Sequence, residues 1–385
     1  MDSAALDISW RSALLAMLVA PLVLLGMRLW FHQPERTACR WLAALFLMIV
    51  LECMPQILGF SGAYRVWPGL TFAPFSYELW FGPLVYLHAH ALMDKRPLGM
   101  RWLWLAPGAA QLAYYLWAFS SLGDYRSKWA YNDAVHEPYV APAILGGALI
   151  LALVCAGMTW RLIRQYREFL VTTQSTASDL DPSWLARLLG WLGLVLALWL
   201  GFEVVDYLFG PLGYVRRYPM FVLIAAALSW TGFEALARIR QPYVALRPGL
   251  PVPPPPAASE PGHDWSTMGR DLVAQIRDNQ WFLEPGFSLA NLARRAGLNE
   301  SYASRAINRG LSRNFNQVVN EARVQYACER LLSHPDETIL DVAHASGFSA
   351  KATFNRVFRA DTGLTPTAWR RSRPAQNVSK SVNHG

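Results

Sequence analysis

The sequence contains 385 residues, of which 53% are hydrophobic and 16% are charged, with a formal net charge of +8. This length predicts two or three domains, and four cysteines without a C-x-x-C pair argue against a disulfide framework or a zinc site. The charge is uneven, because residues 265–385 carry 16 Lys and Arg against 10 Asp and Glu. A polyanion is therefore an expected partner of the C-terminal third.

Apolar segments dominate residues 1–240. A bilayer span requires about 20 mostly apolar residues, and seven segments qualify: 13–31, 42–60, 72–92, 102–120, 140–160, 184–208 and 218–236. The acidic start of the chain argues against a cleavable signal peptide, so the first segment is expected to remain. We predict an all-α protein whose N-terminal domain, residues 1–240, is a seven-helix transmembrane bundle.

The flanking charges predict the direction of the bundle. With the C-terminus inside, 13 Lys and Arg lie on cytoplasmic flanks and 6 on outer flanks, as the positive-inside rule requires. We therefore expect a multi-pass membrane protein, with the N-terminus outside and the C-terminus in the cytoplasm. The segment RLIRQYREFL, residues 161–170, is expected to prolong the fifth span into the cytoplasm.

Charged residues within the spans are costly and suggest functional sites. Three hypotheses remain open for them: a shared polar pocket that senses a signal, hydrogen bonds between helices, or a position near the membrane interface. The candidate sensing residues are Glu52, Glu78, His88, Glu203 and Asp206.

Residues 241–265 are rich in proline and predict a semi-rigid spacer, since proline favours extended polyproline II. From residue 266 to residue 375 the sequence predicts a soluble, basic, helical domain, followed by a tail over residues 376–385. These ranges define the expected domain organisation.

Two helix-turn-helix patterns occur in this C-terminal domain. In the first, Ser288 and Asn299 are expected N-caps, and Gly297 fits a left-handed turn between two helices. Tyr302, Ala303, Ala306 and Ile307 are its expected core positions. A long amphipathic helix at about 315–332 separates it from the second pattern.

The second pattern repeats the same order of signals. Thr338 is the expected N-cap of its first helix, Gly347 forms the turn, and Ser349 opens its second helix. Phe354, Val357 and Phe358 are its expected core positions. Two such patterns joined by one helix are harder to obtain by chance than one.

Residues 272–371 resemble the AraC/XylS family of bacterial transcription activators. The resemblance is carried by LARRAG, YASRAI, Gly310, Arg323 with Ala327 and Leu331, ILDVAHASGF and FNRVFRADTGLTPTAWR. It departs from the family at Ala303 and Ala306, where larger aliphatic residues are usual. The first recognition helix is therefore expected to be less firmly packed.

The resemblance implies that two recognition helices enter successive major grooves of double-stranded DNA. The implied base-contacting residues are Ser301, Ser304, Arg305, Lys351, Asn355 and Arg356. The implied phosphate-contacting residues are Arg309, Arg313 and Arg359. Arginine can pair with guanine and asparagine with adenine, whereas phosphate contacts fix position without specifying sequence.

The layout resembles the membrane-bound members of this family, which predicts a one-component sensor that regulates transcription of promoter sites. The expected partners are DNA, the lipid bilayer and an unknown small-molecule or envelope signal; RNA polymerase and a second copy of the chain are further candidates. No nucleophile elbow, P-loop, dinucleotide fingerprint or zinc signature is present in the sequence. We therefore expect neither enzymatic activity nor a cofactor or metal.

Three alternatives stay open. The bundle could be a transporter or membrane enzyme with a regulatory DNA-binding appendage. It could be only an anchor, from which proteolysis within residues 241–262 releases the regulator. The basic helices could instead bind RNA or anionic lipid.

Overall fold

The computed structural model describes residues 8–33, 35–175, 177, 180–210, 214–238, 243–246 and 264–372. Within these ranges every regular element is a helix, and the only bridge of strand type joins Gln174 to Ser288. The predicted all-α class is thereby confirmed for the described residues. The chain divides into two compact units, Met1–Arg164 with Pro182–Leu246, and Gln165–Asp181 with Arg247–Gly385.

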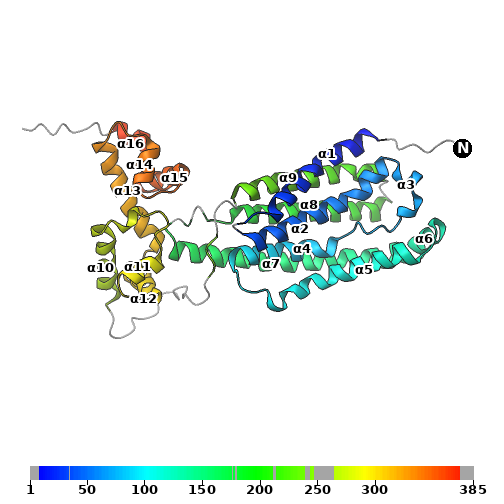
Figure 1. Ribbon diagram of the computed structural model, residues 1–385, viewed down its shortest axis with the longest axis horizontal. Coiled ribbons are helices and arrows are strands. Elements are labelled where there is room, and N and C mark those ends of the chain that lie inside the picture. Colours follow the sequence, from blue (N-terminus) through cyan, green and yellow to red (C-terminus); the bar gives the residue numbers. More distant parts are fainter. Residues whose placement is uncertain are drawn as a thin grey trace, which may run out of the picture. The chain divides into compact units, whose positions relative to one another are not determined.

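The first unit is a bundle of long apolar helices (Figure 1). Helix α2 packs against α1 and α4, and α9 packs against α1 and α8. Short elements connect the long ones. The elements in chain order are α1 (Trp10–Trp30), α2 (Arg36–Phe60), α3 (Ala63–Val66), η1 (Pro68–Leu70), α4 (Glu78–Met93), η2 (Gly99–Leu105), α5 (Ala106–Ser121), α6 (Tyr125–Tyr131), η3 (Asn132–Val140), α7 (Ala141–Thr173), α8 (Ser183–Phe209) and α9 (Tyr214–Arg238).

Five helical segments are long and apolar enough to cross a membrane: Trp10–Trp30, Arg36–Phe60, Tyr125–Thr173, Ser183–Phe202 and Val215–Ala237. The other two predicted spans, 72–92 and 102–120, correspond to α4 and α5, which have 16 residues each. At 1.5 Å per residue such a helix is about 24 Å long, shorter than a hydrocarbon core of about 30 Å. The count of seven spans therefore stays a prediction.

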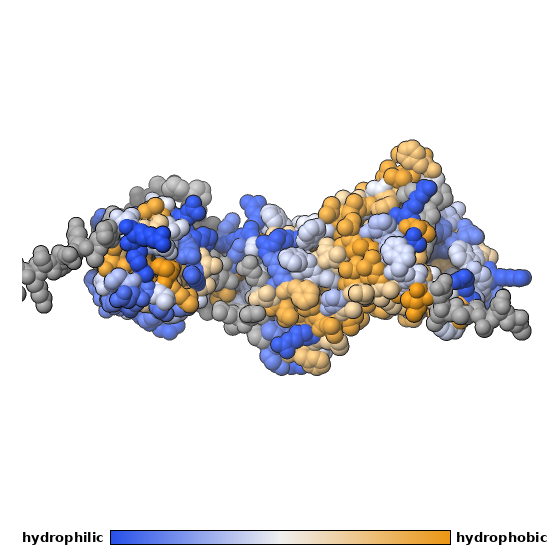
Figure 2. Space-filling view, turned by 90° about the horizontal axis from the view of Figure 1, so that it is seen from above, coloured by the Kyte–Doolittle hydropathy of each residue, from blue (hydrophilic) through white to orange (hydrophobic). Residues whose placement is uncertain are grey.

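Exposed apolar side chains cover the long helices of the first unit, as Figure 2 shows by the hydrophobic surface along them. Large hydrophobic residues on α1 and α7 illustrate this, with Met17 at 72% exposed and Leu153 at 68%. Contiguous apolar surface of this kind marks a contact with a membrane or another protein.

Helix α7 extends well beyond its apolar part. It runs to Thr173 and includes all of residues 161–170, so the helix continues over these residues as predicted, while its position in the cytoplasm stays a prediction. The division between the two units falls within it, after Arg164. The last turns of α7 therefore belong to the second unit.

The start of the predicted linker belongs to the first unit. The Tyr243 backbone N–H donates to Glu35 Oε1 at 2.6 Å, and Lys95 Nζ donates to the same oxygen at 2.7 Å. The Leu246 N–H donates to the Met93 carbonyl at 2.7 Å. Most of the predicted linker, residues 241–242 and 247–263, lies outside the described residues.

The second unit contains two small cores on either side of one long helix, α13. The first core ends at Ala322 and the second begins at Val324 on this helix. The remaining elements divide between the two cores. In chain order they are α10 (Trp265–Asp278), η4 (Trp281–Leu283), α11 (Leu289–Arg295), α12 (Glu300–Arg305), η5 (Ala306–Gly310), α13 (Phe315–Ser333), α14 (Ile339–Ala345), α15 (Lys351–Thr362) and α16 (Pro366–Ser372).

Small side chains in the first core are matched by close packing of backbones. Ala303 and Ala306 are fully buried, and α10 packs against α12 and η5. A Cβ atom added at Gly310 would lie 1.9 Å from the Trp265 carbonyl oxygen, because the two backbones touch there. The expectation of a loosely packed first recognition helix is therefore wrong: α10 approaches closely enough to fill the space that larger aliphatics would occupy.

Candidate nucleic-acid interface

The first helix-turn-helix forms where the sequence predicted it. The Ser288 hydroxyl accepts from the Asn291 N–H at 3.3 Å, and Asn299 Oδ1 accepts from the Tyr302 N–H at 2.8 Å. Gly297 has a φ of +68° and makes the left-handed turn between α11 and α12. The recognition helix then changes from α-helix to the π-helical turn η5.

The second helix-turn-helix is more regular. The Thr338 hydroxyl accepts from the Asp341 N–H at 3.1 Å, and Gly347 turns with a φ of +82°. Recognition helix α15 has 12 residues and its N-cap is Ala350. The prediction that Ser349 opens this helix is off by one residue, because the N-cap position is Ala350, whose side chain has no hydrogen-bond acceptor.

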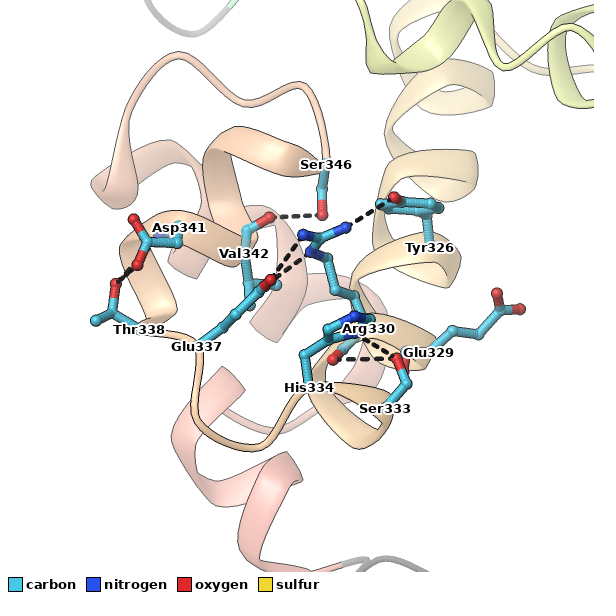
Figure 3. Close-up of polar contacts among 10 residues, drawn as sticks. All are labelled: Tyr326, Glu329, Arg330, Ser333, His334, Glu337, Thr338, Asp341, Val342 and Ser346. Carbon is cyan, nitrogen blue, oxygen red and sulfur yellow. Dashed lines mark hydrogen bonds and ion pairs between the residues drawn. The ribbon is translucent and has the colours of Figure 1, made fainter. Parts of the chain in front are cut away.

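An ion pair fixes the start of the second helix-turn-helix relative to α13. Arg330 donates from Nε and Nη2 to the two oxygens of Glu337, at 2.8 and 2.7 Å, and from Nη1 to Tyr326 at 3.1 Å (Figure 3). Glu337 directly precedes the N-cap of α14. The Arg330 guanidinium holds the pKa of the Glu337 carboxyl below its ordinary value. This clamp orients the short helix on which α15 packs.

The exposed side of α15 is cationic. Lys351, Asn355, Arg356 and Arg359 are all exposed. Together with Thr365 and Thr367, just before and within the first turn of α16, they line a shallow hollow. Among the described residues, no carboxylate pairs with any of these three cations. A polyanion can therefore approach them without displacing an internal partner.

The predicted DNA-contacting residues of the first recognition helix are less exposed than those of α15. Ser301, Arg305 and Arg309 are only half-exposed. Ser304 is 4% exposed, and its hydroxyl accepts from Asn308 Nδ2 at 3.0 Å. The prediction of Ser304 as a base contact does not fit this conformation, since the side chain is buried. Ser304 is better described as part of the packing.

Arg313, an implied phosphate contact, follows this helix in a loop. It is exposed and forms an ion pair with Glu321 of α13. A phosphate would therefore have to compete with a carboxylate for this guanidinium, which makes Arg313 a weaker candidate than Arg359.

The tail of α7 is docked on the first helix-turn-helix. The Ser175 N–H donates to the Phe287 carbonyl at 3.2 Å. Asn316 Nδ2 of α13 donates to the carbonyls of Gln174 and Ser175, at 3.1 and 2.9 Å. Ser175 is 3% exposed, so the segment is an integral part of the second unit. The sequence offered no signal for these contacts, which join residues more than 110 positions apart.

Arg323 joins this segment to both cores. It is 1% exposed, and its guanidinium donates to the Phe282 carbonyl at 2.7 Å, the Glu284 carbonyl at 2.9 Å and the Ser175 hydroxyl at 3.3 Å. It also lies 5.5 Å from the centre of the Phe348 ring in the second helix-turn-helix. A buried charge needs such partners, and here they come from three parts of the unit. The sequence marked Arg323 only through the family resemblance.

Of the five predicted sensing residues, the structure brings two together. Glu52 and Glu78 line one cavity inside the first unit. His88 is fully buried elsewhere, with Nδ1 2.8 Å from the Ala38 carbonyl and its ring 5.5 Å from that of Trp184. The side chains of Glu203 and Asp206 lie outside the described residues. In the part of the chain that the structure describes, no group of three or more His, Cys, Asp or Glu is arranged to hold a metal.

Comparison with known proteins places the second unit among DNA-binding domains. The sequence profile of a helix-turn-helix domain of AraC type matches residues 292–372. Similar curated proteins include uncharacterized HTH-type transcriptional regulators of Staphylococcus aureus, from strains COL and MSSA476, each 34% identical over 111 residues. The aligned region covers 29% of this chain and only 15% of the length of these relatives.

Among solved structures, the chain is similar to the C-terminal domain of AraT, a response regulator from Geobacillus stearothermophilus. The match has 24% identity and a TM-score of 0.27, and covers 32% of this chain and 97% of that domain. The assignment therefore rests on the sequence matches: the C-terminal unit contains an AraC-type helix-turn-helix domain, of a class that serves DNA-binding transcription regulation.

Proposed function

We propose that this chain is a membrane-tethered transcriptional regulator that binds specific promoter DNA through two recognition helices. The observation that carries the proposal is the exposed, unpaired cationic side of α15 within an AraC-type helix-turn-helix domain. We propose that Arg356 and Asn355 contact base edges in a major groove. Lys351 is a further base contact, and Arg359 would bind phosphate.

Membrane tethering is supported by the composition of the first unit. Five of its helical segments have the length and hydropathy of membrane spans, and their exposed apolar side chains are of the kind that marks a contact with a membrane or another protein. We propose the seven-span topology, with the DNA-binding unit in the cytoplasm of a bacterial cell, on the distribution of Lys and Arg between the flanks.

A route for regulation is supported by α7. Its apolar part belongs to the first unit, and its last turns belong to the second, where Ser175 contacts Phe287 and Arg323. We propose that a signal which alters the bundle acts on DNA binding through this continuous helix. Such a signal works only by a difference in affinity for two states of the protein.

Genome-wide crosslinking of the full-length protein to chromosomal DNA tests the function. We expect discrete promoter peaks that disappear in an Arg305→Ala/Arg356→Ala double variant. Arg277→Ala, at an exposed arginine near the end of α10, is the matched control and should retain them. Diffuse signal, or peaks that persist in the double variant, would contradict sequence-specific binding by these helices.

A further inference from the structure

A cavity of about 330 Å³ lies among five helices of the first unit. Its walls come from α2, α4, α7, α8 and α9. Most of the lining is aliphatic or aromatic, and the polar residues are few: Glu52, Gln56, Glu78 and Arg217. Binding sites for small molecules have this composition, and volumes of this order.

Small residues create this space. Ala148, Ala152 and Ala156 recur every fourth residue on α7, so they form one stripe on the side that faces the cavity, and Gly193 of α8 lies on the lining too. A Cβ atom added at Gly193 would meet no heavy atom within 4 Å. Larger side chains at these positions would fill the cavity.

The helix directions separate a polar end from an apolar end. Hydrogen bonds between Ala38 and His88, and between Glu52 and Tyr77, set α2 antiparallel to α4. Bonds from Tyr218 to Arg11, and from Ser229 to Leu18, set α9 parallel to α1. Since α1 and α2 are themselves antiparallel, as the bond from Ser12 to Ile57 requires, the C-terminal end of α2 and the N-terminal ends of α4 and α9 lie at the same end of the bundle.

The polar lining therefore gathers at that end. Gln56, Glu78 and Arg217 lie near it, with Glu52 one helical turn further in, whereas Val85 and Leu228 lie toward the other end. The two carboxyls are held in place. Glu52 Oε2 accepts from the Tyr77 N–H at 3.0 Å, and Glu78 accepts a hydrogen bond from Gln111 of α5.

We propose that this cavity binds a small amphipathic amine. Its protonated amino group would lie between the carboxyls of Glu52 and Glu78, and its aliphatic body would occupy the apolar end. The formal charge of the lining is two carboxylates against one guanidinium, so one positive charge on the ligand balances it. A buried charge without such compensation is costly.

The size of the cavity limits the ligand. At about 30 Å³ per water molecule, the cavity corresponds to roughly eleven water volumes, which suits an alkylamine of about ten carbons. This inference deepens the proposed sensing role and rests on it for its biological meaning. Binding itself is measurable without DNA.

Saturable binding of radiolabelled decylamine to the full-length protein in phosphatidylcholine nanodiscs tests the proposal. We expect displacement by unlabelled decylamine, with decanol and decanoate at least tenfold weaker because they lack the positive charge. Glu52→Gln should weaken binding about tenfold or more, and Gly193→Leu should abolish it by filling the cavity. Gly201→Leu, on the same helix but away from the cavity and equally free of collisions, should bind as the unchanged protein does.

The proposal is overturned if decylamine shows no saturable binding, if decanoate displaces it equally well, or if Gly193→Leu binds normally. Elution of each variant as a single nanodisc species shows that it is folded. Crosslinking to promoters is scored separately. If the protein binds decylamine but not promoters, the proposed function is contradicted and this inference stands. If it binds promoters but not decylamine, this inference is contradicted and the proposed function stands.

Discussion

The two helix-turn-helix units share a plan and differ in what surrounds them. In the first, the recognition helix is half-covered, ends in a π-helical turn and lies under α10, and the unit carries the docked tail of α7. In the second, a regular helix presents Lys351, Asn355, Arg356 and Arg359 to solvent. The same motif is thus buried by its contacts in one place and left open in the other.

This difference assigns the units different roles. The first helix-turn-helix is in contact with other segments of its own chain. It is therefore suited to transmit a conformational change, because DNA binding there would be linked to those contacts. A surface with exposed, unpaired cations is suited to bind an anion with sequence preference. We expect the second helix-turn-helix to contribute most to DNA recognition and the first helix-turn-helix to connect DNA binding to the rest of the chain.

The largest predicted effect concerns the two turn glycines. Alanine at Gly297 meets only backbone strain, about 1–2 kcal/mol, since no atom lies within 4 Å of its Cβ. Alanine at Gly347 adds contacts of 2.7 Å with the carbonyls of Phe282 and Leu283, for a total loss of about 2–5 kcal/mol. Urea unfolding followed by fluorine NMR of labelled Trp265 and Trp369, one in each core, measures both losses. Equal losses would show that the turn at Gly347 does not pack closely against the carbonyls of Phe282 and Leu283.

The next effect concerns the arginines of the two recognition helices. Arg356→Ala should lose about 1–3 kcal/mol of binding at a promoter site, as expected for a base contact, or roughly 10–100-fold in affinity. Arg305→Ala should lose less, because its helix is half-covered. Fluorescence anisotropy with a promoter site identified by crosslinking gives both values. The reverse order would refute the division of roles between the units.

A smaller effect is expected at the docked segment. Asn316→Ala removes two hydrogen bonds to the carbonyls of Gln174 and Ser175, worth about 1–2 kcal/mol together. Amide hydrogen exchange around residues 173–175 should rise about 5–30-fold, with little change in α15. Asn279→Ala, which removes a bond within α10, serves as the control. Unchanged exchange in the Asn316 variant would mean that the tail of α7 is held by other contacts.

The smallest effect depends on pH. The pKa of Glu337 is held below its ordinary value by Arg330. This pair therefore stabilises the second helix-turn-helix at pH values above the pKa of an unfolded glutamate, about 4.3. The stabilisation disappears as the pH falls through the lowered pKa. Glu337→Gln should therefore be less stable than the unchanged protein at pH 7 and equally stable below the lowered pKa. Unfolding reported by labelled Trp369 across this range tests it; a difference that persists in acid would assign the loss to packing.

Local signals in the sequence predicted most of the second unit. The caps Ser288, Asn299 and Thr338 and the turns at Gly297 and Gly347 follow from short-range chemistry, and the structure has all of them. The exposed cations of α15 followed from helical periodicity combined with the family resemblance. These features depend on neighbours within a few residues.

Long-range contacts were not predictable. Helix α10 approaches the first recognition helix through Gly269 and Gly310, and the docking of Ser175 on Phe287 joins segments that lie far apart in the chain. Glu52 and Glu78 were identified as costly charges, but the cavity that they line results from alanines on α7, which resemble ordinary packing residues in sequence. His88 shared their sequence signal and is instead a buried hydrogen-bonding residue.

Selection of binding sites from random DNA, with the full-length protein, tests the central claim most directly. Profiles are compared for the unchanged protein, Arg356→Ala and Arg305→Ala. We predict that Arg356→Ala loses preference at one or two adjacent base pairs in one half of the site and retains the other half, while Arg305→Ala changes the profile less. An unchanged profile in Arg356→Ala, with specificity lost only in Arg305→Ala, would contradict the claim that the second helix-turn-helix is the principal DNA-recognition surface.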